Sequence, residues 1–250
     1  MHKRPLWMIE KFEVILLAAG VGSRLKPITD YIPKCLVPIC GEPLLKIWLD
    51  KLTNQNEVMK IHVNTYYKAE QVEAYIKSYN SEKVEIHRES ELLGTAGTIN
   101  NLIKDIQTKS VIIAHADNLS IFELSDFKKC FDKRNENCLG TMMAFETKNP
   151  ETCGMINIDP QNQVLDYIEK PKNSDYKIAN AAVYFIDVDM YKKRMRFTDF
   201  DLSKDFIVDN FRYFNIYMNN QLHIDIGTIE SYIDGQFLYK EKSPKFIDQS

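Results

Sequence analysis

The chain has 250 residues, of which 44% are hydrophobic, and this length can bury a large α/β core in one domain. The formal net charge is only −3, so no basic field over the molecule argues for nucleic acid. No stretch has the length and hydropathy of a signal peptide or a membrane span. We therefore expect a cytoplasmic protein that binds no nucleic acid and no membrane, as a monomer or a homo-oligomer.

Strand-like and helix-like segments alternate over roughly the first 145 residues, which is the order of a mostly parallel sheet with helices on both faces. The sequence predicts strands at 13–19, 59–65, 84–88, 111–116 and 140–146. It predicts helices near 43–55, 68–79, 96–105 and 125–136. The predicted fold class is α/β, with a Rossmann-like central sheet.

The pattern changes after Pro150, where short strands are separated by turns that contain proline and asparagine. We predict strands at 155–159, 164–169 and 181–186, and a last helix from Thr228 to about Lys240. These segments indicate a small mixed β region packed on the same sheet. Residues 1–250 are thus predicted to form a single domain with two parts, about 13–145 and about 150–250.

The five cysteines are odd in number, scattered, and without the spacing of metal ligands. This pattern favours reduced thiols over a disulfide framework. The positions are Cys35, Cys40, Cys130, Cys138 and Cys153.

An apolar run, Val14 to Leu17, is followed by the small residues Ala18-Ala-Gly-Val-Gly22, then by Ser23 and Arg24. Small residues let a backbone approach a ligand closely, and the N–H groups and cations that follow suit a polyphosphate. The spacing matches neither a P-loop nor the Gly-x-Gly-x-x-Gly motif of a dinucleotide-binding dehydrogenase. The pattern therefore indicates another kind of phosphate site, to which Lys34 contributes a second cation.

Ligands of open α/β sheets bind beyond the carboxyl ends of the strands, so residues at strand ends are the next candidates. The predicted strand ends lead into Glu89 to Gly97, into His115-Ala-Asp117, and into Asp225-Ile-Gly-Thr228. Two aspartates at strand ends suit Mg²⁺, which takes oxygen ligands from one or two carboxylates and from phosphates. We predict Asp117 and Asp225 as Mg²⁺ ligands, and the role of His115 stays open.

The sequence L-A-A-G-x-G-S-R-L-x-P-x-T, followed by P-K-x-L-V-P, resembles the signature of the sugar-1-phosphate nucleotidyltransferases. The resemblance runs from about Val14 to Gly227, with its motifs in the same order. Asp117 and the aspartate of D-I-G-T, Asp225, look like the metal-binding pair of that family. At the first of these sites the chain has His115-Ala116 where many relatives have a glycine ahead of the aspartate.

The resemblance implies transfer of a nucleoside monophosphate from an NTP to a phosphorylated small-molecule acceptor, with release of pyrophosphate. Arg24 would act as the transition-state cation and Lys34 as its partner. In the E-K-P motif, Glu169 would bind sugar hydroxyls and Lys170 the sugar phosphate, while Gly154 and Asn180 would close the acceptor pocket. The predicted nucleotide-binding residues are Leu17, Ala19, Gly20, Gly22, Ser23, Glu89, Gly94, Thr95 and Asp117.

The resemblance leaves the base and the acceptor open. Glu89 lies where the base-reading residue of the family tends to lie, and a carboxylate accepts hydrogen bonds from cytosine or guanine, which favours CTP or GTP. The segment Leu93-Gly-Thr-Ala-Gly97 is similar to the corresponding segment of mannose- and heptose-1-phosphate guanylyltransferases. This similarity implies a role in the synthesis of surface-polysaccharide precursors. Gly20-Val-Gly-Ser-Arg24 is equally similar to phosphocholine cytidylyltransferases. Two alternatives stay open. The acceptor could be a non-sugar compound such as phosphocholine or phosphoglutamine, or the protein could be an inactive regulatory subunit that binds a nucleotide sugar.

Overall fold

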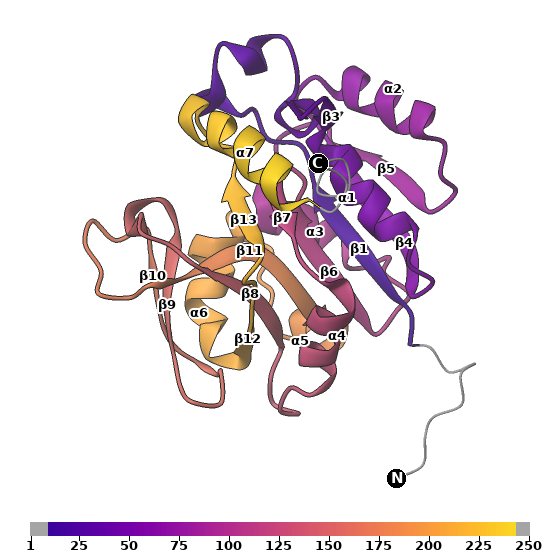
Figure 1. Cartoon of the computed structure of the whole chain (residues 1–250). Coiled ribbons are helices and arrows are strands. Elements are labelled where there is room, and N and C mark those ends of the chain that lie inside the picture. Colours follow the sequence, from indigo (N-terminus) through magenta and orange to yellow (C-terminus); the bar gives the residue numbers. More distant parts are fainter. Residues whose placement is uncertain (1–9, 244–250) are drawn as a thin grey trace.

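A nine-stranded sheet forms the centre of the protein (Figure 1). The structure is a computed structural model and describes residues 10–243. The first nine residues, in which we predicted no leader, lie outside that range. Between residues 10 and 243, no helix combines the length and the apolar character that crossing a membrane requires.

The main strand order is β10-β9-β11-β6-β1-β4-β5, and β8 joins β11 to a ninth strand, β12. β6, β1, β4 and β5 are parallel to one another, whereas β11 runs antiparallel to β6, β8 and β9. The nine strands are β1 (Phe12–Leu17), β4 (Val58–Thr65), β5 (Val84–Arg88), β6 (Ser110–His115), β8 (Gly140–Glu146), β9 (Gly154–Ile158), β10 (Val164–Glu169), β11 (Ile178–Asp187) and β12 (Phe214–Met218). Two small sheets pair β2 (Pro38–Ile39) with β3 (Glu42–Pro43) and β7 (Asn118–Ile121) with β13 (Leu222–Asp225).

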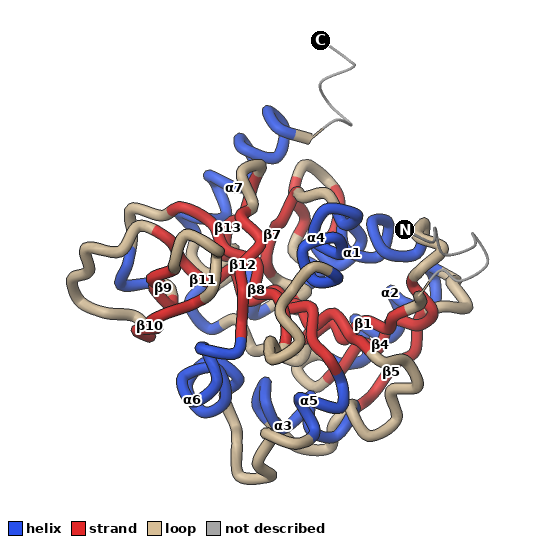
Figure 2. Tube along the Cα trace, turned by 90° about the horizontal axis from the view of Figure 1, so that it is seen from below, coloured by secondary structure: helices blue, strands red, loops and turns tan. Residues whose placement is uncertain are grey.

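Helices lie on both faces of the sheet (Figure 2). The α-helices are α1 (Leu44–Thr53), α2 (Ala69–Tyr79), α3 (Gly94–Leu102), α4 (Leu124–Asp132), α5 (Val188–Lys192), α6 (Val208–Asn210) and α7 (Ile229–Lys242). A π-helical segment, η5 (Leu202–Ile207), leads into α6. The predicted α/β fold class, with a mostly parallel central sheet and a mixed β region, is confirmed.

The two faces of the sheet have separate cores, because successive side chains of a strand point to opposite faces. On β1, Val14 and Leu16 belong to the cluster covered by α1, α2 and α4, whereas Ile15 and Leu17 belong to the cluster under α3, α5 and η5. All six residues of β1 are buried, as expected for a central strand with helices on both sides. The sheet therefore fixes the direction in which β1 enters the glycine-rich loop.

The predicted strand at 140–146 is present as β8, but it lies outside the parallel set. It pairs antiparallel with β11 and parallel only with β12. A local pattern predicts that a segment is extended, but the choice of neighbour depends on β11, which follows β8 by more than thirty residues. We also did not predict β12, β7 or the short helices between β11 and β12.

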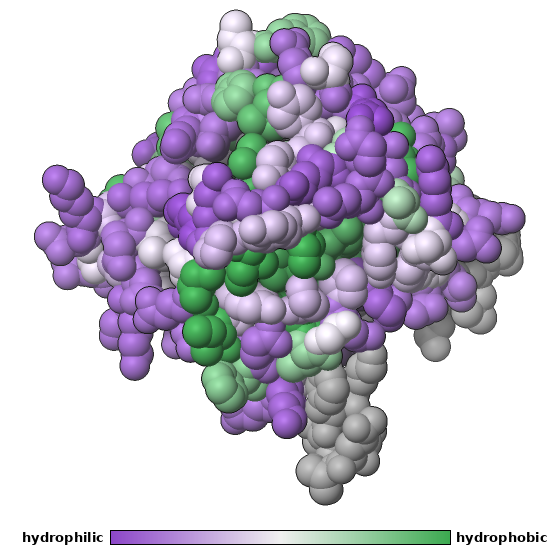
Figure 3. All heavy atoms as spheres, turned by 90° about the horizontal axis from the view of Figure 1, so that it is seen from above, coloured by the Kyte–Doolittle hydropathy of each residue, from purple (hydrophilic) through white to green (hydrophobic). Residues whose placement is uncertain are grey.

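The last helix, α7, covers a third apolar cluster formed with β7, β13 and the segment that follows the glycine-rich loop. On the outer side of α7, Ile229, Ile233 and Phe237 are exposed, and they are spaced four residues apart along the helix. Figure 3, which views the molecule from above, shows a mostly hydrophilic face crossed by a hydrophobic band. All five cysteines are free, in agreement with the sequence prediction.

Candidate active site

An open cavity of about 750 Å³ lies at the carboxyl ends of β6, β8, β10 and β13. It brings together nine of the residues that the sequence predicted for the site. These are Arg24, Lys34, Thr95, Asp117, Gly154, Glu169, Lys170, Asn180 and Asp225. Residues from both predicted parts of the chain therefore line one cavity.

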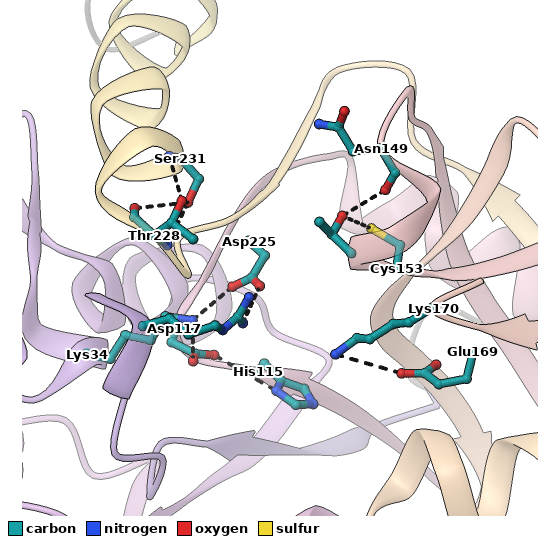
Figure 4. Close-up of polar contacts among 12 residues, drawn as sticks. Lys34, His115, Asp117, Asn149, Cys153, Glu169, Lys170, Asp225, Thr228 and Ser231 are labelled. Carbon is teal, nitrogen blue, oxygen red and sulfur yellow. Dashed lines mark hydrogen bonds and ion pairs between the residues drawn. The ribbon is translucent and has the colours of Figure 1, made fainter. Parts of the chain in front are cut away.

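Lys34 lies at the centre of the polar contacts on one side of the cavity (Figure 4). Its Nζ is 2.8 Å from Asp117 Oδ2 and 2.9 Å from Asp225 Oδ1. Arg24 Nη2 donates to Asp225 Oδ2 over 3.3 Å, and its side chain is 60% exposed. The two predicted cations and the two predicted metal ligands thus form one connected group, which we call the Lys34 cluster.

The small sheet of β7 and β13 explains why the two aspartates meet. Asp225 at the end of β13 pairs with Asn118 at the start of β7, and Asp117 directly precedes Asn118. Gly227 leaves room beside them, because a Cβ there would lie 2.9 Å from both Arg24 Nη2 and Asp225 Oδ2. Two antiparallel strands far apart in sequence therefore position both carboxylates.

In the Lys34 cluster, the opposite charges stabilise each other's ionised forms. Burial alone would lower the pKa of the Lys34 ammonium group, but Asp117 and Asp225 raise it above the usual value. Burial would likewise raise the pKa of Asp225, but Lys34 and Arg24 hold it below the usual range. Asp225 is therefore held in its anionic form, and the carboxylate oxygens of Asp117 and Asp225 are of the kind that Mg²⁺ prefers.

The glycine-rich loop stands beside the cavity, and its shape depends on two side chains. Gly22 has φ +66°, and its carbonyl oxygen accepts a hydrogen bond from Thr29 Oγ1 (2.9 Å). Ala18 N–H donates to Asn64 Oδ1 over 2.7 Å. The predicted nucleotide-binding residues that do not line the cavity itself are Leu17, Ala19, Gly20, Gly22, Ser23, Glu89 and Gly94.

Glu89, the predicted base-reading residue, hydrogen bonds with its own chain. Its Oε1 accepts from Asn64 Nδ2 (2.8 Å) and from Thr98 Oγ1, and its Oε2 accepts from Leu93 N–H (3.5 Å). Because Asn64 also accepts a hydrogen bond from Ala18 N–H, Glu89 is connected through Asn64 to the glycine-rich loop. The contacts place Glu89 in a position to orient that loop.

The segment before η5 covers the N-terminus of α3. Ala96 N–H donates to the carbonyl oxygen of Phe200 (2.9 Å), and Leu202 N–H donates to Thr95 Oγ1 (2.7 Å). Gly94 has φ +74°, and a Cβ there would lie 2.3 Å from the Phe200 carbonyl oxygen. Gly94 is therefore required both by its backbone conformation and by this close contact.

Glu169 and Lys170 face the Lys34 cluster from the opposite wall (Figure 4). Lys170 is 50% exposed, and its Nζ is 3.9 Å from Glu169 Oε1. Tyr167 donates from its hydroxyl group to Glu169 Oε2, and Gly154 permits this because a Cβ there would lie 2.2 Å from that hydroxyl oxygen. Asn180 donates from Nδ2 to the hydroxyl oxygen of Tyr184 (2.7 Å), four residues further along the same strand, β11.

Several cavity residues were missed by the sequence prediction. The end of β8 and the segment that follows it, from Phe145 to Cys153 except Pro150, line the cavity, and so do Asp201, Ser203 and His223. Burial lowers the pKa of His223 to about 4, so the ring is neutral at pH 7 and bonds to Ser120 Oγ through Nδ1 (2.8 Å). The polar sequence at the end of β8 was a usable signal, because that strand also ends at this edge of the sheet.

Comparison with known proteins agrees with this geometry. The family model described as nucleotidyl transferase matches residues 13–242. The bifunctional protein GlmU of Methanocaldococcus jannaschii is 28% identical over 180 residues, which cover 72% of this chain and 41% of that protein. The chain thus spans about two fifths of the length of that relative.

Two further relatives match over nearly their whole length. The D-glycero-α-D-manno-heptose 1-phosphate guanylyltransferase of Aneurinibacillus thermoaerophilus is 26% identical over 228 residues, which cover 90% of this chain and 96% of that protein. HddC from Yersinia pseudotuberculosis has a TM-score of 0.77 and 26% identity, and covers 92% of this chain and 100% of that one. The same protein complexed with GMP-PN gives a TM-score of 0.76. The resemblance inferred from the motifs is therefore confirmed, and this chain belongs to the nucleotidyl transferase family.

Proposed function

We propose that the protein transfers a nucleoside monophosphate from an NTP to a phosphorylated small metabolite, most consistently a sugar 1-phosphate. The proposal rests mainly on one observation, the placement of two groups of charged residues on opposite walls of one cavity. The Lys34 cluster, with Asp117, Asp225 and Arg24, lies on one wall, and Lys170 and Glu169 lie on the other. One wall suits a triphosphate and the other suits the phosphate and hydroxyl groups of an acceptor.

The reaction needs no general base in this site. The second pKa of a phosphate monoester is about 6, so the acceptor oxygen is already a nucleophile at neutral pH. That oxygen attacks the α-phosphorus, a new P–O bond forms, and the bond to the bridging oxygen of the β-phosphate breaks, which releases pyrophosphate. Arg24 and Lys34 neutralise the negative charge that grows on the phosphate oxygens, and Lys170 holds the acceptor phosphate in line.

Asp117 and Asp225 fit a Mg²⁺ ion, because each presents hard carboxylate oxygens at the triphosphate side of the cavity. When bound, the ion supplies positive charge to the phosphates of the NTP. In the proposal, Lys34 keeps the two carboxylates close together, so the chain itself prepares the site.

We favour GTP or CTP as the donor. GTP is supported by the similarity to a heptose 1-phosphate guanylyltransferase and to HddC, which was solved with GMP-PN. The product would then be an NDP-sugar, and its place would be in the synthesis of surface-polysaccharide precursors.

The charge of the cavity favours a second acceptor class. The lining residues include eight carboxylates, four of which are Glu146, Glu151, Glu230 and Asp234, against four lysines and arginines. An excess of carboxylates suits an acceptor that carries a cationic group beside its phosphate, as phosphocholine does. This candidate requires the same transfer chemistry and differs only in the acceptor.

The test is pyrophosphate release by the full chain with four NTPs and a panel of sugar 1-phosphates, phosphocholine and phosphoglutamine. We expect release with GTP or CTP and one acceptor class, together with loss of release in Asp225→Asn. Lys170→Ala should raise the acceptor KM while the NTP KM stays near that of the wild type. If no combination releases pyrophosphate although the NTP binds, the chain is a nucleotide-binding regulatory protein and the proposal is wrong.

A further inference from the structure

A second group of metal-ligating side chains lies on the edge of the central sheet, away from the cavity. His62 on β4 and Glu85 and His87 on β5 each offer one ligand atom, and these three atoms all lie within 4.8 Å of one another. We call this group the β4–β5 cluster. None of its three residues lines the cavity described above.

The sheet itself brings the three side chains to one face. β4 and β5 are parallel, His62 pairs with Glu85, and His87 follows two residues after Glu85. Because side chains alternate between faces, all three point to the face that carries α3. The arrangement therefore belongs to the rigid part of the fold.

The distances are close to those of a coordination sphere. His62 Nδ1 is 2.9 Å from His87 Nε2, and Glu85 Oε1 is 3.7 Å from the same His87 atom. Two nitrogens bound to one tetrahedral Zn²⁺ at about 2.0–2.1 Å would be roughly 3.3 Å apart, so a small rotation of the His87 ring would admit the ion.

A buried carboxylate fixes the orientation of the His62 ring. Glu13, on the central strand β1, is 1% exposed, and its Oε1 accepts from the N–H groups of Gln107 (2.7 Å) and Thr108 (3.0 Å). Its Oε2 lies 2.7 Å from His62 Nε2, and this contact assigns the ring hydrogen to Nε2. His62 Nδ1 then directs a lone pair toward His87, and a carboxylate behind a histidine is a common support of metal ligands.

Glu85 is oriented in a similar way, and the cluster is open to solvent. Lys60 Nζ lies 2.7 Å from Glu85 Oε2, which leaves Oε1 directed at the histidines. The side chain of His62 is 4% exposed, that of His87 24% and that of Glu85 46%. An ion can thus enter from solvent, and a water molecule can complete its coordination.

We propose that the β4–β5 cluster is a binding site for a divalent transition-metal ion, with Zn²⁺ the best match, which ties the edge strand β5 to β4. Two imidazoles and one carboxylate select Zn²⁺ or Co²⁺ over Mg²⁺ and Ca²⁺, which prefer oxygen ligands. With Glu13 and Glu85 against Lys60, the surroundings carry a net negative charge that a dication balances. The proposal does not depend on the transfer activity.

The experiment is a Zn²⁺ titration of the chelator-treated full chain against a chromogenic chelator, with Co²⁺ absorption as a second readout. We expect one Zn²⁺ bound through these residues, an increase in Tm when one equivalent is added, and Co²⁺ bands typical of nitrogen and oxygen ligands. His87→Gln and Glu85→Gln should each weaken this binding by about tenfold or more. Excess Mg²⁺ should not compete.

Two control variants locate the ion. His2→Ala removes a histidine outside the described residues, and Asp225→Asn alters the cavity, and neither should change the affinity of this site. Equal Zn²⁺ affinity in the wild type, His87→Gln and Glu85→Gln would overturn the proposal. Loss of the ion in either control but not in His87→Gln would overturn it as well, and loss of transfer activity alone would not bear on it.

Discussion

Lys34 is 8% exposed and contacts two carboxylates at once. Its removal would leave Asp117 without this cation, and Asp225 with only the longer 3.3 Å contact to the exposed Arg24. Breaking a buried ion pair costs roughly 3–5 kcal/mol, and because Asp225 is 44% exposed we expect the lower end, which corresponds to a decrease in Tm of roughly 6–12 °C for a chain of this size. We therefore expect Lys34→Ala to lower Tm strongly in a thermal unfolding experiment. Lys26→Ala, which removes an exposed pair with Asp30, is the matched control and should change Tm little.

Arg24 makes a weaker contact at the open side of the same cluster, and its side chain is 60% exposed. We expect Arg24→Ala to retain its fold and to lower kcat by roughly 10²-fold or more, because the charge of Arg24 matters most in the transition state. Steady-state kinetics with the substrates found by the pyrophosphate assay measure this. An effect on KM alone would mean that Arg24 only binds the triphosphate.

Glu89 has two possible roles that one substitution separates. If Glu89 reads the base, Glu89→Gln should narrow the preference for GTP or CTP over UTP and dTTP, because an amide adds a donor. If it only orients Asn64 and the glycine-rich loop, kcat/KM should decrease by a similar factor for all four triphosphates. Comparison of kcat/KM for the four NTPs in both proteins decides between these roles. Equal use of all four by the wild type would exclude base reading by Glu89.

The pairing of β9 with β10 depends on a glycine that faces a tyrosine. A Cβ at Gly154 would lie 2.2 Å from the Tyr167 hydroxyl oxygen, so Gly154→Ala should displace Tyr167 and release Glu169. We expect a several-fold increase in the acceptor KM and a lower Tm, with the NTP KM nearly unchanged. Tyr167→Phe is the matched control, since it removes the hydrogen bond to Glu169 and leaves the strand pairing intact. An unchanged acceptor KM in both variants would show that Glu169 does not contact the acceptor.

The elements that the sequence predicted correctly are those with a strong local pattern. β1 and β6 are mostly apolar runs, β4 alternates apolar with polar residues, and α1 and α4 have amphipathic spacing, so their positions follow from the chain itself. β7 and β12 are short and contain both polar and apolar residues. They are extended because each pairs with a strand distant in the sequence, β13 and β8 respectively. The ends of α3 also differ from the prediction of 96–105, since the helix begins at Gly94 beneath Phe200.

The sequence was a better guide to which residues line the cavity than to the contacts that these residues make there. Strand ends and family motifs selected Arg24, Lys34, Asp117 and Asp225 as candidates, and the structure brings all four to one cavity. They were not sufficient to show that Lys34 joins both aspartates, because β13 must first pair with β7. The partners of Glu89 also depend on tertiary contacts that no local pattern encodes, whereas the polar end of β8 was a local signal for the cavity segment that follows that strand.

The two parts of the chain share one sheet, and β11 of the second part pairs directly with β6 of the first. A fragment that ends near residue 148 would expose the edge of β6 and would lose the part of that face's core that Tyr184, Tyr191 and Phe206 contribute. We therefore expect calorimetry of the full chain to give one cooperative transition, and the fragment 10–148 to give none. Two separate transitions in the full chain would contradict the prediction of a single domain.

The contact between Lys34 and Asp225 spans 191 positions of the chain. During synthesis on the ribosome, the glycine-rich loop and Lys34 emerge first, Asp117 follows, and β13 emerges only after all the other described strands. Until β13, the last strand of the described residues, is in place, a nascent protein therefore has only one of the two carboxylate partners of Lys34 and no complete Lys34 cluster. A folded Lys34 cluster thus marks a chain that has been translated at least as far as Asp225.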